Sequence, residues 1–227
     1  MKAPTAVSEA SAAASYDRLL RSVAHEIRGP VGVAWGALDQ LEADLQSGEV
    51  AINPRLFEMS RRGLRRALRL AERLSRVSEL EHRPDPLPVA KVDLCAVVRQ
   101  AHHDVLGLES RRGVEVVIGF EQAQRVYAIA SLEWLRFAIG ELICLAVRFA
   151  RRKVVVLVRD DSRPSIRIES DGNAEVCFGN TAVPLGECSS DVELMVRVAR
   201  KALALQTANL EAASEGSVLV RFGEGGG

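Results

Sequence analysis

The spacing of apolar residues between positions 20 and 77 constrains the fold more than any other feature of the sequence. In two stretches they recur at alternating steps of three and four, which places them along one side of an α-helix. The first stretch comprises Leu20, Ala24, Ile27, Val31, Ala34, Leu38, Leu41 and Leu45, and the second comprises Leu56, Met59, Gly63, Ala67, Leu70, Leu74 and Val77. Two antiparallel helices cannot bury both stripes alone, so we expect two copies to pack as a dimeric four-helix bundle.

Local signals set the limits of this helical hairpin. Gln46-Ser47-Gly48 predicts the end of the first helix, and Asn53-Pro54 predicts the start of the second. Three prolines between His82 and Pro88 predict a stiff linker at 83–91. The hairpin is therefore predicted at 16–82. Residues 1–15 are rich in alanine and serine and lack the apolar core of a signal peptide, so we expect them to be disordered.

After the linker, helical and strand patterns alternate. Helices are predicted at 94–110, 131–150 and 191–205, strands at 114–118, 153–158 and 165–168, and a closing β-hairpin at 209–212 and 217–222. This mixed order predicts that 92–223 folds as a two-layer α/β sandwich.

The composition excludes several classes of protein. The chain has 227 residues, of which 48% are hydrophobic and 26% charged, so it is globular rather than disordered. No apolar run is long enough to span a bilayer. The cysteines are far apart and form no C-x-x-C pair, which predicts reduced thiols rather than disulfides or a zinc site. They are Cys95, Cys144, Cys177 and Cys188. A cytoplasmic protein is therefore expected.

One motif in the first helix carries chemistry. The segment His25-Glu26-Ile27-Arg28-Gly29-Pro30 resembles the H-box of sensor histidine kinases, H-E-[LI]-R-[TN]-P, at all but one position. The resemblance implies that His25 accepts a phosphoryl group. A largely unprotonated imidazole is a suitable nucleophile, and Glu26 would hydrogen-bond its other nitrogen or act as a base. Family members that dephosphorylate receivers have threonine or asparagine where Gly29 stands, so that activity is not expected here.

The second domain resembles the ATP-binding domain of the same kinases, without its ATP-binding residues. The stretch from Glu141 to Phe149 keeps the apolar frame of the family's N-box, N-L-[LI]-x-N-A-x-[KR]-[FY], but Glu141 and Leu145 replace its asparagines. Leucine offers no oxygen to a magnesium ion. Residues 170–174 only faintly match the family's D-x-G-x-G, and Asp171-Gly172 is interpreted as a turn. Residues 189–194, at the place of a glycine-rich segment, contain no glycine. No cofactor is therefore expected on this chain.

Arginines are concentrated on the second helix. They are Arg61, Arg62, Arg65, Arg66, Arg69, Arg73 and Arg76. One interpretation is a solvated face. Another is docking of an acidic receiver domain, which cationic side chains would steer, by Arg28, Arg62, Arg65, Arg66 and Arg69. Nucleic-acid binding is disfavoured because no aromatic residue for base stacking lies between Arg61 and Arg76. The remaining histidines, His82, His102 and His103, are expected to be solvated.

The leading hypothesis is a dimeric histidine phosphotransferase of a two-component phosphorelay, in which His25 passes a phosphoryl group to the aspartate of a response-regulator receiver. Its partners would be receivers, with a hybrid histidine kinase as a further candidate, and magnesium would be supplied by the receiver. One alternative is a non-catalytic adaptor that dimerises and binds receivers or a kinase. The other is an active histidine kinase with a divergent ATP site.

Overall fold

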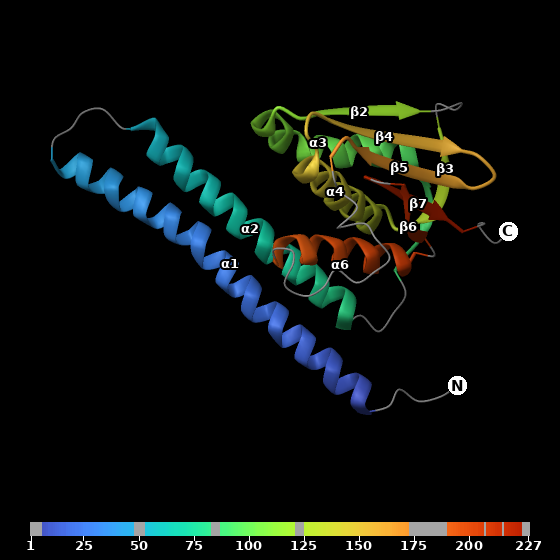
Figure 1. Cartoon of the computed structure of the whole chain (residues 1–227), viewed down its shortest axis with the longest axis horizontal. Helices are drawn as coiled ribbons and strands as arrows, with labels where there is room; N and C mark the ends of the chain where they lie inside the picture. The colour runs from blue at the N-terminus through green and yellow to red at the C-terminus, as the bar shows by residue number, and fades with distance from the viewer. Residues whose placement is uncertain are drawn as a thin grey trace. The chain divides into compact units, whose positions relative to one another are not determined.

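The computed structural model describes residues 6–47, 53–82, 87–120, 125–172, 190–206, 208–214 and 216–223. The chain divides into two units, Met1–Arg76 and Val77–Gly227 (Figure 1). The boundary lies within a helix rather than in the predicted linker, because Leu80 near the end of that helix is buried in the core of the second unit.

The first unit contains the predicted helical hairpin. Helix α1 spans Ala6–Gln46 and helix α2 spans Pro54–His82. The prediction of disorder at 1–15 is wrong for residues 6–15, which are helical. Alanine and glutamate in this stretch are strong helix formers. Residues 1–5 lie outside the described residues. Helix α1 continues through Pro30, so this proline does not end it.

The side of α1 that is buried within one chain overlaps the predicted stripe only in part. Ala34 is buried as predicted, and Val23 and Ala37, each one residue before a predicted position, are buried as well. Val31 and Leu38, which belong to the prediction, are exposed in the single chain. On α2 the prediction is closer, since Gly63, Ala67, Leu70 and Val77 are buried and Met59 is exposed.

Small residues bring the two helices into close contact. A Cβ atom on Gly63 would lie 2.3 Å from the carbonyl oxygen of Pro30 and 3.1 Å from the Cβ of Ala34. One turn earlier on α2, the buried Ser60 hydroxyl lies 3.2 Å from the carbonyl oxygen of Ala34. Any side chain at position 63 would push the backbones apart, so glycine is required at this crossing.

The second unit is a two-layer α/β sandwich, as predicted. Its main sheet has the strand order β2-β4-β5-β7-β6, in which only β2 and β4 are parallel. Three helices cover one face of this sheet (Figure 1). The strands are β2 (Glu115–Phe120), β4 (Lys153–Asp160), β5 (Pro164–Ser170), β6 (Ala208–Ser214) and β7 (Ser217–Phe222), and the helices are α3 (Leu94–Arg112), α4 (Leu132–Phe149) and α6 (Ser190–Ala204).

A second, two-stranded sheet was not predicted. Strand β1 (Ala90–Asp93) pairs antiparallel with β3 (Tyr127–Ala130). The linker was predicted at 83–91, but its last two residues belong to β1, which starts at Ala90. Asp93 ends β1 and caps α3, accepting a hydrogen bond from the backbone N–H of Cys95 at 2.9 Å.

The helix crossing yields a stability prediction. Gly63→Ala should lower the free energy of unfolding by about 1–3 kcal/mol, because its methyl group meets backbone atoms. Gly36→Ala is the matched control, since nothing lies within 4 Å of its added Cβ, and it should stabilise the helix by up to about 1 kcal/mol. Urea unfolding followed by circular dichroism measures both. A stabilised Gly63→Ala would contradict the close crossing.

Candidate functional site

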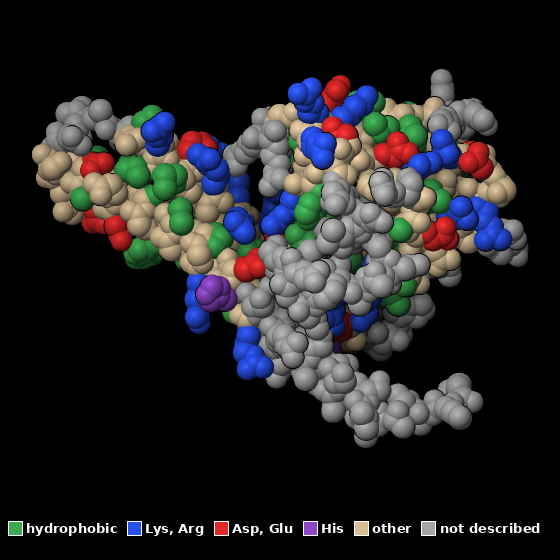
Figure 2. All heavy atoms as spheres, viewed as in Figure 1, with side chains coloured by type: hydrophobic (Ala, Val, Ile, Leu, Met, Phe, Trp, Pro, Cys, Tyr) green, Lys and Arg blue, Asp and Glu red, His purple; other side chains and the backbone are tan. Residues whose placement is uncertain are grey.

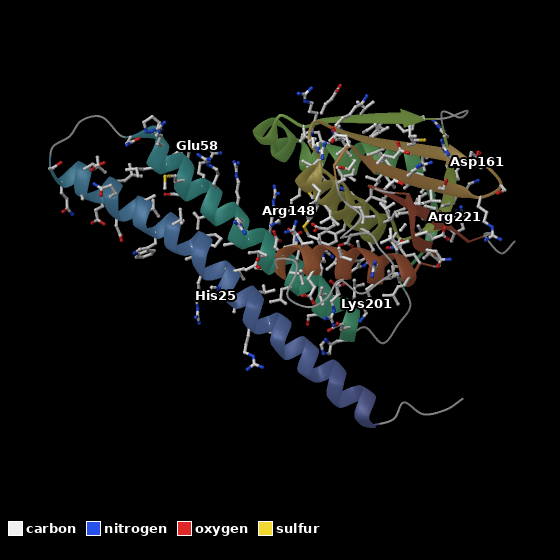
Figure 3. The ribbon with its side chains drawn as sticks, viewed as in Figure 1. His25, Glu58, Arg148, Asp161, Lys201 and Arg221 are labelled. Carbon is white, nitrogen blue, oxygen red and sulfur yellow. The ribbon has the colours of Figure 1, made fainter. Side chains whose placement is uncertain are left out.

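His25 lies on the surface of α1, on the side opposite to α2. It stands two residues after the buried Val23, and successive residues turn by about 100° around a helix. The imidazole is therefore about half a turn away from the buried side. It is exposed, and Figure 3 shows it projecting away from α2. A partner could approach this side chain without any opening of the hairpin.

Glu26, the predicted hydrogen-bond partner of His25, lies in a different environment from the histidine. It is half-buried, whereas His25 is exposed, and neighbouring residues on a helix point in directions that differ by about 100°.

The exposed surface of α2 has an arginine flank and an apolar flank. Arg62, Arg66 and Arg69 follow one another at steps of four and three, which places them in one row. Arg73 continues this row but is buried. On the opposite flank, exposed large apolar residues follow one another at steps of seven and four, which also places them on one side of the helix. They are Phe57, Leu64 and Leu68.

The structure does not gather all five predicted docking arginines at one place. Arg62, Arg66 and Arg69 form the row on the flank of α2, whereas Arg65 faces outward and Arg28 lies on α1, one turn after His25. Arg21, which lies one turn before His25 and is exposed, was missed by the sequence analysis. Its spacing of four from His25 was the signal that could have identified it.

In the second unit, the N-box-like positions of α4 are part of the core. Leu145 is fully buried in the main hydrophobic cluster, and Glu141 is 9% exposed. The basic position of the motif, Arg148, donates a hydrogen bond to the Asp191 carboxylate at 2.8 Å. Asp191 is near the start of α6, in the segment that replaces the family's glycine-rich stretch. This ion pair joins the end of α4 to the start of α6 and satisfies the charge of Arg148 within the protein.

Asp171 and Gly172, predicted as a turn, form a bend after β5, and Asp171 anchors the segment that precedes β4. Its carboxylate accepts hydrogen bonds from the backbone N–H groups of Arg151 at 2.8 Å and Arg152 at 2.9 Å. Desolvation opposes the charged form, but hydrogen bonds from the backbone N–H groups of residues 151–153 outweigh it and lower the pKa of Asp171. Because the folded-state pKa is lowered, the stabilisation is present at neutral pH and is lost as the pH falls through that value. Gly172 is required beside it, since a Cβ there would lie 1.7 Å from the carbonyl oxygen of Phe149.

Within the described residues, the cysteines and the remaining histidines form no cluster that could bind a metal ion. Cys95 is fully buried, and desolvation raises the pKa of its thiol. Cys144 is half-buried, and Cys177 and Cys188 lie outside the described residues. His82 and His103 are exposed, whereas His102 is half-buried.

Two classes of feature are absent from the described part of the chain. It contains no group of three or more His, Cys, Asp or Glu side chains placed to hold a metal ion. Each of its helices is too short or too polar to cross a membrane.

Comparison with solved structures identifies the fold. The structure is similar to that of the Acinetobacter baumannii histidine kinase AdeS, with a TM-score of 0.63 and 15% sequence identity over 89% of this chain and 98% of that chain. It is also similar to full-length ShkA in complex with AMPPNP, with a TM-score of 0.56 and 15% identity over 90% of this chain and 44% of that chain. No protein-family model matches the sequence, and no curated protein matches it significantly. The chain therefore has a histidine-kinase-type fold, in which a helical region precedes an α/β domain that matches a histidine-kinase ATPase domain.

Proposed function

We propose that this chain is a histidine phosphotransferase, which accepts a phosphoryl group on His25 from one receiver aspartate and passes it to another. The observation that carries the proposal is a contrast between the two units. The hairpin presents the motif histidine to solvent, whereas in the second unit Leu145 packs in the core and Arg148 pairs with Asp191. On this proposal the second unit supplies no phosphoryl group, so the donor is a protein that is already phosphorylated.

The transfer step requires little from this chain beyond position and charge. The lone pair of the unprotonated imidazole nitrogen forms the N–P bond, the P–O bond to the receiver aspartate breaks, and the bonding pair leaves on the carboxylate. Onward transfer reverses these changes on a second receiver. The arginine row formed by Arg62, Arg66 and Arg69, with Arg21 and Arg28 around His25, would attract an acidic receiver and orient it.

The apolar flank of the hairpin supports a homodimer. Leu68 is 69% exposed and Leu64 is 47% exposed on α2, while Trp35 on α1 is 67% exposed. Val31, Leu38, Leu45 and Phe57 extend this surface. Figure 2 shows apolar side chains grouped on the hairpin surface. Such a surface is unfavourable in water, and a second copy would bury it. His25 lies about 120° around α1 from Val31, so dimerisation through this surface would leave it open.

The two alternatives predict different behaviour. An active kinase would bind ATP in the presence of magnesium and transfer its γ-phosphate to His25. An adaptor would bind receivers without using the His25 nucleophile. Phosphoryl transfer to His25 from a receiver distinguishes the proposal from the adaptor.

A mutation of the histidine tests this transfer. His25→Ala should abolish the uptake of label from a phosphorylated receiver, because no other described residue resembles a phosphoacceptor, and it should leave the dimer intact. His82→Ala is the matched control, since His82 is also exposed on the hairpin, and it should transfer at the wild-type rate. Labelled receiver and autoradiography give the measurement. Unimpaired uptake in His25→Ala would refute the proposal.

An arginine variant in the same assay separates docking from chemistry. With Arg62, Arg66 and Arg69 replaced by glutamine, transfer should be slow at dilute receiver, recover as receiver concentration rises, and depend less on salt, because exposed charges act on association. Unchanged kinetics would assign these side chains to a solvated face.

A mutation on the apolar flank tests the assembly of the dimer. Leu68→Glu should convert the dimer to a monomer, because it places a charge in the proposed apolar interface. The exposure of Leu68 in the single chain means that the hairpin itself should still fold. Ala43→Glu, an exposed position on the outward side of α1, should remain dimeric. Light scattering coupled to gel filtration measures both masses. A Leu68→Glu variant that stays dimeric would exclude this flank as the interface.

A further inference from the structure

The outward face of the main sheet contains a polar hollow that the proposed transfer does not use. Its volume is about 560 Å³, within the range of small-molecule sites. It is formed by β4, β5, the turn between them, and the β6–β7 hairpin. The charged and hydroxyl side chains that line it are Arg159, Asp161, Ser162, Arg163, Ser165, Arg167, Glu211 and Arg221.

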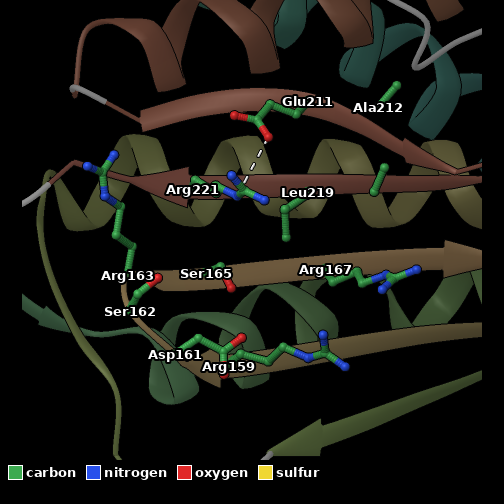
Figure 4. Close-up of a pocket in the computed structure, with 11 residues that line it drawn as sticks. Arg159, Asp161, Ser162, Arg163, Ser165, Arg167, Glu211, Ala212, Leu219 and Arg221 are labelled. Atoms are coloured by element: carbon green, nitrogen blue, oxygen red, sulfur yellow. Dashed lines mark ion pairs between the residues drawn. The ribbon is translucent and has the colours of Figure 1, made fainter.

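Strand register explains why the hollow exists. Arg159 on β4 pairs with Ser165 on β5, and Ser165 pairs with Arg221 on β7. Paired residues point to the same face of a sheet, so a short serine lies between two long arginines. Ser165 is only 6% exposed and forms part of the floor. Arg167, two residues further along β5, is on the same face (Figure 4).

The lining has an excess of positive charge. Four arginines and two acidic residues line the hollow, which leaves two positive charges in excess. The Arg221–Glu211 ion pair is long, at 3.6 Å, and both side chains are about half exposed, so it contributes little. Arg167 also pairs with Glu169 at 2.6 Å, just outside the hollow. Arginines that share one face of a sheet repel one another, and a bound anion would remove this repulsion.

We propose that this hollow binds a small phosphate-bearing solute, with Arg159 and Arg221 contacting it from either side of Ser165. Guanidinium groups donate paired hydrogen bonds that match phosphate oxygens, and the serine hydroxyls add further donors. The recessed floor suits a compact ligand better than a flat protein surface. This site is separate from His25, and the proposal does not depend on the function proposed for that residue.

Titration of the full chain with pyrophosphate at constant ionic strength, followed by calorimetry, tests the proposal. Saturable binding is expected, and Arg159→Gln with Arg221→Gln should weaken it by about tenfold or more. Ser165→Leu should have a similar effect, because it fills the floor without changing the charge. Arg55→Gln with Arg61→Gln is the control, since it removes two exposed charges from α2 that have no role in the proposed docking, and it should leave the affinity unchanged.

Several results would overturn the proposal. Absence of saturable binding at millimolar pyrophosphate would exclude the site. If the control variant lost as much affinity for pyrophosphate as the Arg159 and Arg221 variant, the binding would be general attraction to positive charge rather than a site. Wild-type affinity in a folded Ser165→Leu protein would place the ligand elsewhere. Sedimentation with phosphatidylglycerol vesicles that requires Arg159 and Arg221, without pyrophosphate binding, would assign the hollow to a lipid surface instead. Circular dichroism of each variant establishes that it is folded.

Discussion

The close crossing of α1 and α2 determines what the hairpin can present to other molecules. Gly63 allows the backbone of α2 to approach Pro30 and Ala34, and this contact fixes the rotation of both helices about their axes. With the small residues turned inward, His25 faces solvent, Leu68 lies on an apolar flank, and the arginines lie on the other flank. If α1 and α2 lay a few ångströms further apart at this crossing, the contact would no longer hold α1 in one rotation about its axis. The exposure of His25 depends on that rotation. The proposed chemistry, docking and dimerisation therefore rest on one backbone contact.

The second unit keeps the layered arrangement of a histidine-kinase ATPase domain and uses its polar residues to hold that arrangement. Arg148 pairs with Asp191, Asp171 anchors the turn that precedes β4, and Leu145 packs in the core. Each of these contacts contributes to folding, and Leu145 stands where the resemblance to kinases would place an asparagine that holds magnesium. A fold alone does not specify an activity, so the phosphoryl donor has to be identified by experiment.

Features set by local patterns could be predicted from the sequence, and features set by contacts between distant segments could not. The two long helices and the strands of the main sheet have clear periodicity. The end of α1 at Gln46 and the start of α2 at Pro54 were predicted, but the start of α1 was placed ten residues too late, at 16 instead of Ala6. The predicted stripes contain Ala34 and Gly63, which make the close contact, but the pattern did not show that Val31 and Leu38 would lie outside this contact and remain exposed in the single chain. Strands β1 and β3 have only four residues each, which is too short a run for an alternation of polar and apolar residues to predict a strand. The arginine-lined hollow depends on the register of three strands, which no local pattern encodes.

Equilibrium titration of the full-length chain with ATP in the presence of magnesium tests the central claim most directly. If the second unit has exchanged nucleotide contacts for internal ones, calorimetry should detect no saturable binding up to millimolar ATP, and His25 should gain no label from its γ-phosphate. Magnesium-dependent binding in the micromolar range, accompanied by phosphorylation of His25, would contradict the account and identify the chain as an active kinase.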